Sequence, residues 1–206
     1  MVYVNHIDYL TLRKVFKTPK TEVLMKQLSQ LYCPDYLHIG LKAYKVPADV
    51  HEFRDNLCWG QRLMMATPHT YDIESMMYFV ANYFYSGEHS PEAVQGYMKK
   101  ILGCLAKEVY PVLVRLVGLF EQMIETEEKK LRGDVSPEMR AADIDRLKPF
   151  TDLNILQMIA EKTGCKLKDA HLESYNTVFA LLLQEKETAD FAKRYERIIT
   201  AKNKKP

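Results

Sequence analysis

The residue types that most often carry catalysis or bind metal ions are scattered through this 206-residue chain. Among the six histidines, no two have the one-turn spacing that lets a pair of imidazoles share a metal ion. Among the four cysteines, no two form the C-x-x-C pair typical of structural zinc sites. These residues are His6, His38, His51, His69, His89, His171, Cys33, Cys58, Cys104 and Cys165. We therefore expect no metal site, no cofactor and no disulfide framework.

One catalytic arrangement is conceivable from the sequence. The Cys58 thiol would be the nucleophile, with His51 and Glu52 as its base and orienting group. A catalytic thiol needs a partner in space, however, and a free cysteine is more commonly a buried structural residue. The sequence contains neither a glycine-rich phosphate loop nor a G-x-S-x-G nucleophile elbow. We predict no catalytic residue, and a helical enzyme with an unrecognised site stays open as an alternative.

Three carboxylates, Glu121, Glu125 and Glu128, lie on one face of a predicted helix at spacings of four and three residues. Di-metal carboxylate bundles also need Glu-x-x-His motifs, and the sequence has none. Lys129 and Lys130 follow directly. We interpret the segment as a solvated, salt-bridged helix face.

The composition excludes several classes of protein. Hydrophobic residues make up 47% of the chain and charged residues 27%, as in ordinary globular proteins. A net charge of +2 is too small for a dedicated nucleic-acid binder, and we interpret the terminal lysines, Lys202, Lys204 and Lys205, as a solvated tail. The longest apolar run, 109–120, contains Arg115 and is shorter than the roughly 20 residues that cross a bilayer. Since the N-terminus does not resemble a signal peptide, we expect a cytoplasmic protein that binds neither nucleic acid nor membrane.

Apolar spacing and helix-boundary residues predict a mostly helical chain. Ser90-Pro91-Glu92 and Ser136-Pro137-Glu138 each combine a capping serine, a proline at the first helical position and an acidic first turn. Gly133 and Gly164 stand where helices commonly end. The predicted helices cover residues 21–32, 73–85, 91–107, 108–131, 152–163 and 173–199.

The predicted fold class is all-α, an irregular multi-helix bundle with a long, protruding C-terminal helix. The first sixteen residues fit neither helical nor strand spacing, which leaves a short extended segment open there, and residues 36–44 are mixed in character. The polar stretch between Gly133 and Pro149 is the best candidate for a boundary. We expect a main helical domain over 1–133, a polar linker with a short helix over 134–149 and a C-terminal helical subdomain over 150–206.

A stretch rich in aromatic residues and methionine is the strongest candidate for a binding surface. Methionine side chains repack around different partners and recur in grooves that receive a helix. The same spacing is also typical of plain core packing, which is the commoner case. The residues selected as groove candidates are Trp59, Met64, Met65, Tyr78, Phe79 and Phe84.

Several segments between about residues 55 and 200 follow a recognisable pattern. Residues 57–63 read Leu-Cys-Trp-Gly-Gln-Arg-Leu, 159–164 read Ile-Ala-Glu-Lys-Thr-Gly, and 175–182 begin Tyr-Asn-Thr-Val-Phe. The chain closes with Phe191-x-x-Arg194-Tyr195-x-x-Ile198. Together these patches resemble the tail assembly chaperones of tailed bacteriophages and prophages. The sequence departs from that pattern in lacking a tryptophan near Tyr175, and its first fifty residues have no counterpart.

The resemblance implies a protein that is not an enzyme. It would bind the long helical tape measure protein in the bacterial cytoplasm during tail assembly and be absent from the finished tail. Apolar stripes of the tape measure protein would dock between helices of the chaperone with modest affinity, so that tail-tube subunits can displace it.

Two other functions stay open beside the enzyme. The chain could be a phage structural subunit, such as a connector or ring protein, that remains in the particle. A regulator acting on nucleic acid would need a basic helix face, and the balanced charge argues against one. The sequence does not specify the oligomeric state.

Overall fold

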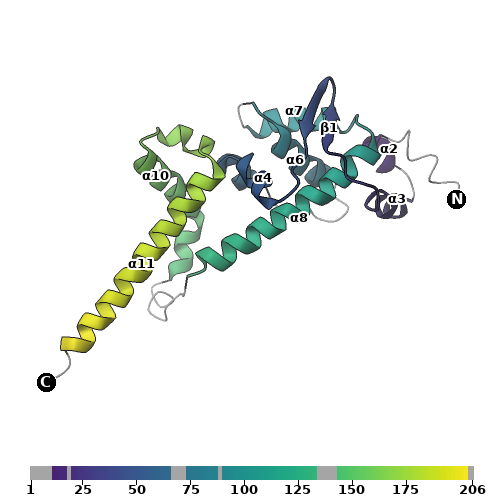
Figure 1. Ribbon diagram of the computed structural model, residues 1–206. Helices are drawn as coiled ribbons and strands as arrows, with labels where there is room; N and C mark the ends of the chain where they lie inside the picture. The colour runs from purple at the N-terminus through teal and green to yellow at the C-terminus, as the bar shows by residue number, and fades with distance from the viewer. Residues whose placement is uncertain (1–10, 18–19, 66–72, 88–89, 134–142, 204–206) are drawn as a thin grey trace. The chain divides into compact units, whose positions relative to one another are not determined.

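Helices form wherever the apolar spacing predicts them, and one small hairpin interrupts them (Figure 1). The structure is a computed structural model that describes residues 11–17, 20–65, 73–87, 90–133 and 143–203. The chain divides into two compact units, an N-terminal unit of residues 1–123 and a C-terminal unit of residues 124–206. The predicted all-α fold class is confirmed.

The N-terminal unit holds short helices, a hairpin and the first part of one long helix. Its elements are α2 (Leu12–Val15), α3 (Thr21–Leu28), β1 (Tyr36–Ile39), β2 (Lys42–Lys45), α4 (Val50–Asp55), α5 (Trp59–Met64), α6 (Ile73–Phe84), α7 (Pro91–Ile101) and α8 (Ala106–Leu131), which continues into the C-terminal unit. Helix α6 packs against both α5 and α7. The buried face of α8 contributes apolar side chains to the same core, among them Val112, Leu116 and Phe120.

The segment predicted as mixed, residues 36–44, is the antiparallel hairpin of β1 and β2. Leu37 and Ile39 alternate with exposed neighbours along β1 and are buried. Gly40 makes the turn with a φ of 63°, a backbone conformation that glycine adopts without strain. The alternation extends over four residues only, which is why spacing alone did not identify a strand.

The helix predicted over 91–107 ends earlier, at Ile101, and the next helix, predicted to begin at residue 108, begins at Ala106. Tertiary hydrogen bonds hold the segment between the two helices. The backbone amides of Leu12 and Arg13 donate to the carbonyls of Cys104 and Leu102, at 3.2 Å and 3.3 Å. Thr11 has an extended conformation and pairs with Leu105 in an isolated bridge. The predicted extended N-terminal segment is seen at Thr11 only, and residues 1–10 lie outside the described residues.

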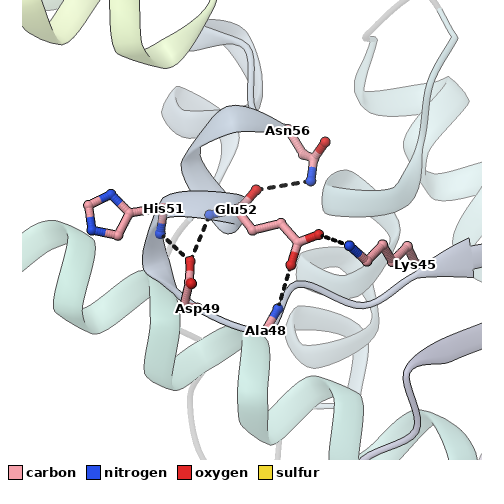
Figure 2. Close-up of polar contacts among 6 residues, drawn as sticks. All are labelled: Lys45, Ala48, Asp49, His51, Glu52 and Asn56. Carbon is pink, nitrogen blue, oxygen red and sulfur yellow. Dashed lines mark hydrogen bonds and ion pairs between the residues drawn. The ribbon is translucent and has the colours of Figure 1, made fainter.

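A polar network fixes the start of α4 just after the hairpin (Figure 2). The Asp49 side chain accepts hydrogen bonds from the backbone amides of His51 and Glu52, at 2.8 Å and 2.9 Å, as an N-cap. Glu52 in turn accepts from the backbone amide of Ala48 at 2.8 Å and forms an ion pair with Lys45. The Lys45 contact and the Ala48 amide hold the pKa of Glu52 below its usual value. The network therefore ties the end of β2 to the first turn of α4.

The C-terminal unit contains the end of α8, η1 (Ile144–Phe150), α10 (Thr151–Thr163), η2 (Leu167–Leu172) and α11 (Tyr175–Asn203). Helix α10 packs against both η1 and η2. The small core of the unit consists of Ile159, Ala170, Tyr175, Val178 and Phe179. The rings of Tyr175 and Phe179 are stacked, with centroids 5.7 Å apart, and the Lys130 ammonium of α8 lies 6.0 Å from the Phe179 centroid.

The unit boundary falls within α8, between Met123 and Ile124, and not in the polar stretch that was predicted to separate a domain 1–133 from a linker 134–149. The predicted helix start at residues 136–138 lies outside the described residues. Pro149, the end of the predicted polar stretch, lies inside η1, directly before α10. The predicted end at Gly164 is confirmed, because Gly164 caps α10 in the left-handed conformation with a φ of 75°.

Gly164 and Gly96 form a matched pair for testing these helix assignments. A Cβ atom would meet no other atom within 4 Å at either position, so only the backbone differs. Replacing Gly164 with alanine forces a side chain into positive φ and is expected to lower the free energy of unfolding by about 1 kcal/mol. Gly96→Ala, inside α7, is expected to raise it by about 0.5–1 kcal/mol. Urea denaturation followed by circular dichroism measures both, and a stabilising Gly164→Ala would contradict the cap.

Candidate functional site

Four of the six groove candidates lie in the core of the N-terminal unit. The exposed fractions of Trp59, Met65, Phe79 and Phe84 are 4%, 4%, 1% and 6%. Met64 and Tyr78 are half-buried. The four buried side chains are therefore out of reach of a partner in this conformation. The burial of these four side chains fits core packing, the commoner role of a stripe of apolar residues, better than it fits a binding groove.

Two buried amide side chains fix α5 to α6 and so place most of these residues. The Gln61 side-chain nitrogen donates to the carbonyls of Asn82 and Tyr83, at 2.8 Å and 3.2 Å. Its side-chain oxygen accepts from the backbone amide of Cys58 at 2.9 Å. The Asn82 side chain donates back to the Gln61 carbonyl at 2.8 Å. Gln61, in the segment of residues 57–63, thus has a structural role.

Ring contacts account for the burial of the aromatic residues on α6. Phe79 meets Phe120 of α8 edge to face, with ring centroids 5.3 Å apart. Tyr83 stacks on Phe53 of α4 at 4.9 Å with an interplanar angle of 5°. Burial raises the pKa of the Tyr83 hydroxyl well above its ordinary value. Such pairs favour a rigid aromatic core over a surface that repacks around partners.

A shallow pocket lies between α6 and α7. Its volume is about 240 Å³, below the range of about 300–1,000 Å³ typical of small-molecule sites. Tyr78 and Phe79 are the two groove candidates that line it. The lining residues are Glu74, Ser75, Tyr78, Phe79, Gln95 and Met98.

The possible nucleophile at Cys58 lacks the surroundings that activate a thiol. Burial is the main cause that raises the pKa of Cys58, which keeps the thiol protonated. His51 Nδ1 lies 2.9 Å from the guanidinium of Arg54, and the Glu52 carboxylate is held by Lys45 and Ala48 (Figure 2). Among the described residues, no three His, Cys, Asp or Glu side chains gather closely enough to hold a metal ion. We also find no helix in the described ranges that could span a membrane.

Four exposed apolar side chains of the C-terminal unit lie close together near the end of α11. Phe191, Tyr195, Ile198 and Ile199 are 62%, 57%, 55% and 37% exposed, and we call these four residues the α11 apolar face. Their spacing of four, seven and eight residues from Phe191 puts them on one side of the helix. The Phe191 and Tyr195 rings are stacked with centroids 6.2 Å apart.

Nothing in the described part of the chain covers the α11 apolar face, since every residue from 191 to 202 is exposed. None of these four residues was predicted as a binding site from the sequence. Phe191, Tyr195 and Ile198 belong to the closing pattern of the resemblance, on the helix expected to protrude, and Ile199 does not. Apolar residues at helical spacing within a charged helix were the signal that could have identified them.

Loss of the Gln61 amide is expected to destabilise the N-terminal unit. Gln61→Leu keeps a similar volume but leaves three backbone groups without the hydrogen bonds described above, which costs about 2 kcal/mol. Gln157→Leu, at an exposed position of α10, is the control and is expected to leave stability within about 0.5 kcal/mol. Urea denaturation distinguishes the two. Equal stability of both variants would contradict the structural role of Gln61.

Phe79 and its neighbour Tyr78 test whether the stripe is core or groove. Phe79→Ala opens a cavity in the core and is expected to cost about 3–5 kcal/mol, while Tyr78→Ala, at a half-buried position, is expected to cost about 1 kcal/mol. Thermal unfolding measures both. A stable, folded Phe79→Ala variant would show that Phe79 is accessible after all.

Comparisons with known proteins identify no relative whose function could be compared with that of this chain. No family model matches the chain, and neither does any curated protein or any solved structure. The family is therefore not assigned, and a functional proposal has to rest on the chemistry of the described residues and on the resemblance of the short sequence patches.

Proposed function

We propose that this chain is a non-enzymatic tail assembly chaperone of a phage or prophage, which binds the helical tape measure protein through the α11 apolar face. The observation that carries the proposal is the exposure of Phe191, Tyr195, Ile198 and Ile199 on one side of a helix whose other residues from 191 to 202 are charged or small. A helix with such a face is suited to pairing with an amphipathic helix of another protein.

The patches of the resemblance fall into two groups that fit this proposal. Ile159, Tyr175, Val178 and Phe179 are buried and build the C-terminal unit. Phe191, Tyr195 and Ile198 are exposed and have no role in holding that unit together. Residues that pack the fold and residues free to bind a partner would both be expected in the pattern of a binding protein.

The size of the face favours a transient complex. Its four side chains expose an area on the order of 400 Å², about half of what one partner buries in a standard stable interface. Weak binding suits a chaperone that shields apolar stripes of the tape measure protein and is later displaced by tail-tube subunits. A structural subunit that stays in the particle would need a larger interface.

The contact surface proposed here differs from the groove first predicted. Met64 and Tyr78 are half-buried and remain predicted contacts. Trp59, Met65, Phe79 and Phe84 would meet a partner only if the N-terminal unit opened. The bacterial cytoplasm, where tails assemble, is the proposed location.

The test is recovery of the partner from the native host after prophage induction. A tagged wild-type chain is expected to retain one very long, helix-rich protein and to be absent from mature particles. The double variant Phe191→Ser/Tyr195→Ser is expected to retain at least about tenfold less, because it removes the aromatic part of the face. Tyr32→Ser, at an aromatic residue that is 79% exposed, is the matched control and should bind as wild type does.

Three outcomes would overturn the proposal. Recovery of the tagged chain inside purified particles would identify a structural subunit. Recovery of no long helical protein would remove the tape measure protein as partner. Equal recovery by wild type and the double variant would place the binding surface away from α11.

A further inference from the structure

We propose that the N-terminal unit binds single-stranded nucleic acid, with phosphate groups beside its lysine and arginine side chains and a base stacked on Tyr36. This activity goes beyond the proposed function and uses a different part of the chain. The expectation that the chain binds no nucleic acid was based on its net charge, which does not describe how the charges are distributed.

The basic residues of the N-terminal unit are concentrated in three segments, 11–20, 36–48 and 93–107. Together these segments contain nine lysine or arginine residues and no aspartate or glutamate. The remainder of residues 1–123 contains four lysine or arginine residues and twelve aspartate or glutamate residues. A net charge near zero therefore conceals a strongly basic part and a strongly acidic part.

The fold brings the three basic segments together, because the loop between α7 and α8 contacts both α2 and the hairpin (Figure 1). On one side of the loop, the backbone amides of Leu12 and Arg13 donate to the carbonyls of Cys104 and Leu102. On the other side, the Cys104 thiol donates to the carbonyl of His38 at 3.5 Å. Segments far apart in the sequence thus build one basic end of the N-terminal unit.

Five cations in these segments are available to phosphate groups, and we call them the basic surface. All five are exposed, and none has a carboxylate partner among the described residues. They are Arg13, Lys17, Lys42, Lys99 and Lys100. Lys45 differs, because Glu52 already pairs with its ammonium group. A strand of phosphate groups that meets unpaired cations releases its own counterions, which makes binding favourable at low salt.

An exposed aromatic residue lies on the hairpin within this basic part. Tyr36 is 52% exposed, and it shares the outer face of β1 with His38, which is also exposed. Leu37 and Ile39 alternate with them and face the core. Aromatic side chains on an open sheet surface stack on unpaired bases, while neighbouring cations attract the phosphate groups. Since stacking of this kind needs bases that are not paired, the expected ligand is a single strand.

The same cations would attract an anionic membrane or an acidic protein segment, and two features favour nucleic acid. A membrane-binding helix keeps its apolar side chains free to enter the lipid, whereas those of α2, Leu12 and Val15, are buried. An acidic protein segment carries no bases that could stack on an exposed tyrosine.

Fluorescence anisotropy of a labelled oligo(dT) of about 20 nucleotides, titrated with the full chain, tests the proposal. Wild type is expected to bind with a Kd on the order of 1–100 µM at about 50 mM salt, and to bind more weakly as the salt concentration rises. Arg13→Glu and Lys99→Glu are each expected to weaken binding about fivefold or more, because each places a carboxylate beside a phosphate group. Tyr36→Ser is expected to weaken binding by about the same factor through the loss of stacking.

The matched controls lie in the C-terminal unit. Lys168→Glu and Lys193→Glu change the net charge by the same amount, at exposed positions of η2 and α11. Tyr195→Ser removes a tyrosine that is 57% exposed, close to the exposure of Tyr36. All three variants are expected to bind the oligonucleotide within about twofold of wild type.

Several results would overturn the proposal. Wild-type affinity in Arg13→Glu and Lys99→Glu, or an equal loss in Lys193→Glu, would place the binding elsewhere. Wild-type affinity in Tyr36→Ser would remove the stacking and with it the preference for a single strand. If wild type binds no oligonucleotide but is retained by vesicles that contain phosphatidylserine, the ligand is an anionic membrane. If polyglutamate of equal total charge displaces the oligonucleotide, the ligand is an acidic protein segment.

Discussion

The reciprocal hydrogen bonds between Gln61 and Asn82 are the interaction on which the N-terminal unit depends most visibly. Both amides are buried, at 5% and 0% exposure, so each hydrogen bond they make matters to stability. The Gln61 side chain uses both its nitrogen and its oxygen, and the Asn82 side-chain nitrogen donates to the Gln61 carbonyl, while the Asn82 side-chain oxygen has no partner among the described residues. These bonds hold α5 against α6 in one register. Trp59 and Met65, near the ends of α5, and Phe79, on α6, then turn inward. The residues that look most like a binding groove are therefore core residues, since the polar pair beside them fixes the helices that carry them.

In the C-terminal unit, by contrast, apolar side chains stay exposed, because its last helix is longer than the elements that cover it. Tyr175, Val178 and Phe179 fill the core of the unit, while the helix continues to Asn203 with every residue from 191 to 202 exposed. Aromatic residues on an uncovered helix favour association in water. The proposed function assigns this uncovered end of α11 to the binding of another helix.

Spacing along the sequence was enough to find the helices but not to decide which faces are buried. The helical period located α8 and α11, and the conformational freedom of glycine located the end of α10 at Gly164. The break between α7 and α8 was predicted after residue 107 instead of after Ile101, because its position depends on hydrogen bonds from Leu12 and Arg13, far away in sequence. The stripe containing Phe79 and the stripe containing Phe191 follow the same spacing rule. Only the neighbours in space make the first a core and the second a surface.

The central claim is that Phe191 and Tyr195 are accessible and bind, whereas Phe79 and Phe84 pack the core. Hydroxyl-radical footprinting of the dilute full chain, read residue by residue with mass spectrometry before and after addition of the recovered partner, tests it most directly. The account predicts rapid labelling of Phe191 and Tyr195 that the partner suppresses, with Phe79 and Phe84 unlabelled throughout. Labelling of Phe79 and Phe84 that the partner suppresses, with Phe191 and Tyr195 unaffected, would contradict it and return the binding surface to α5 and α6.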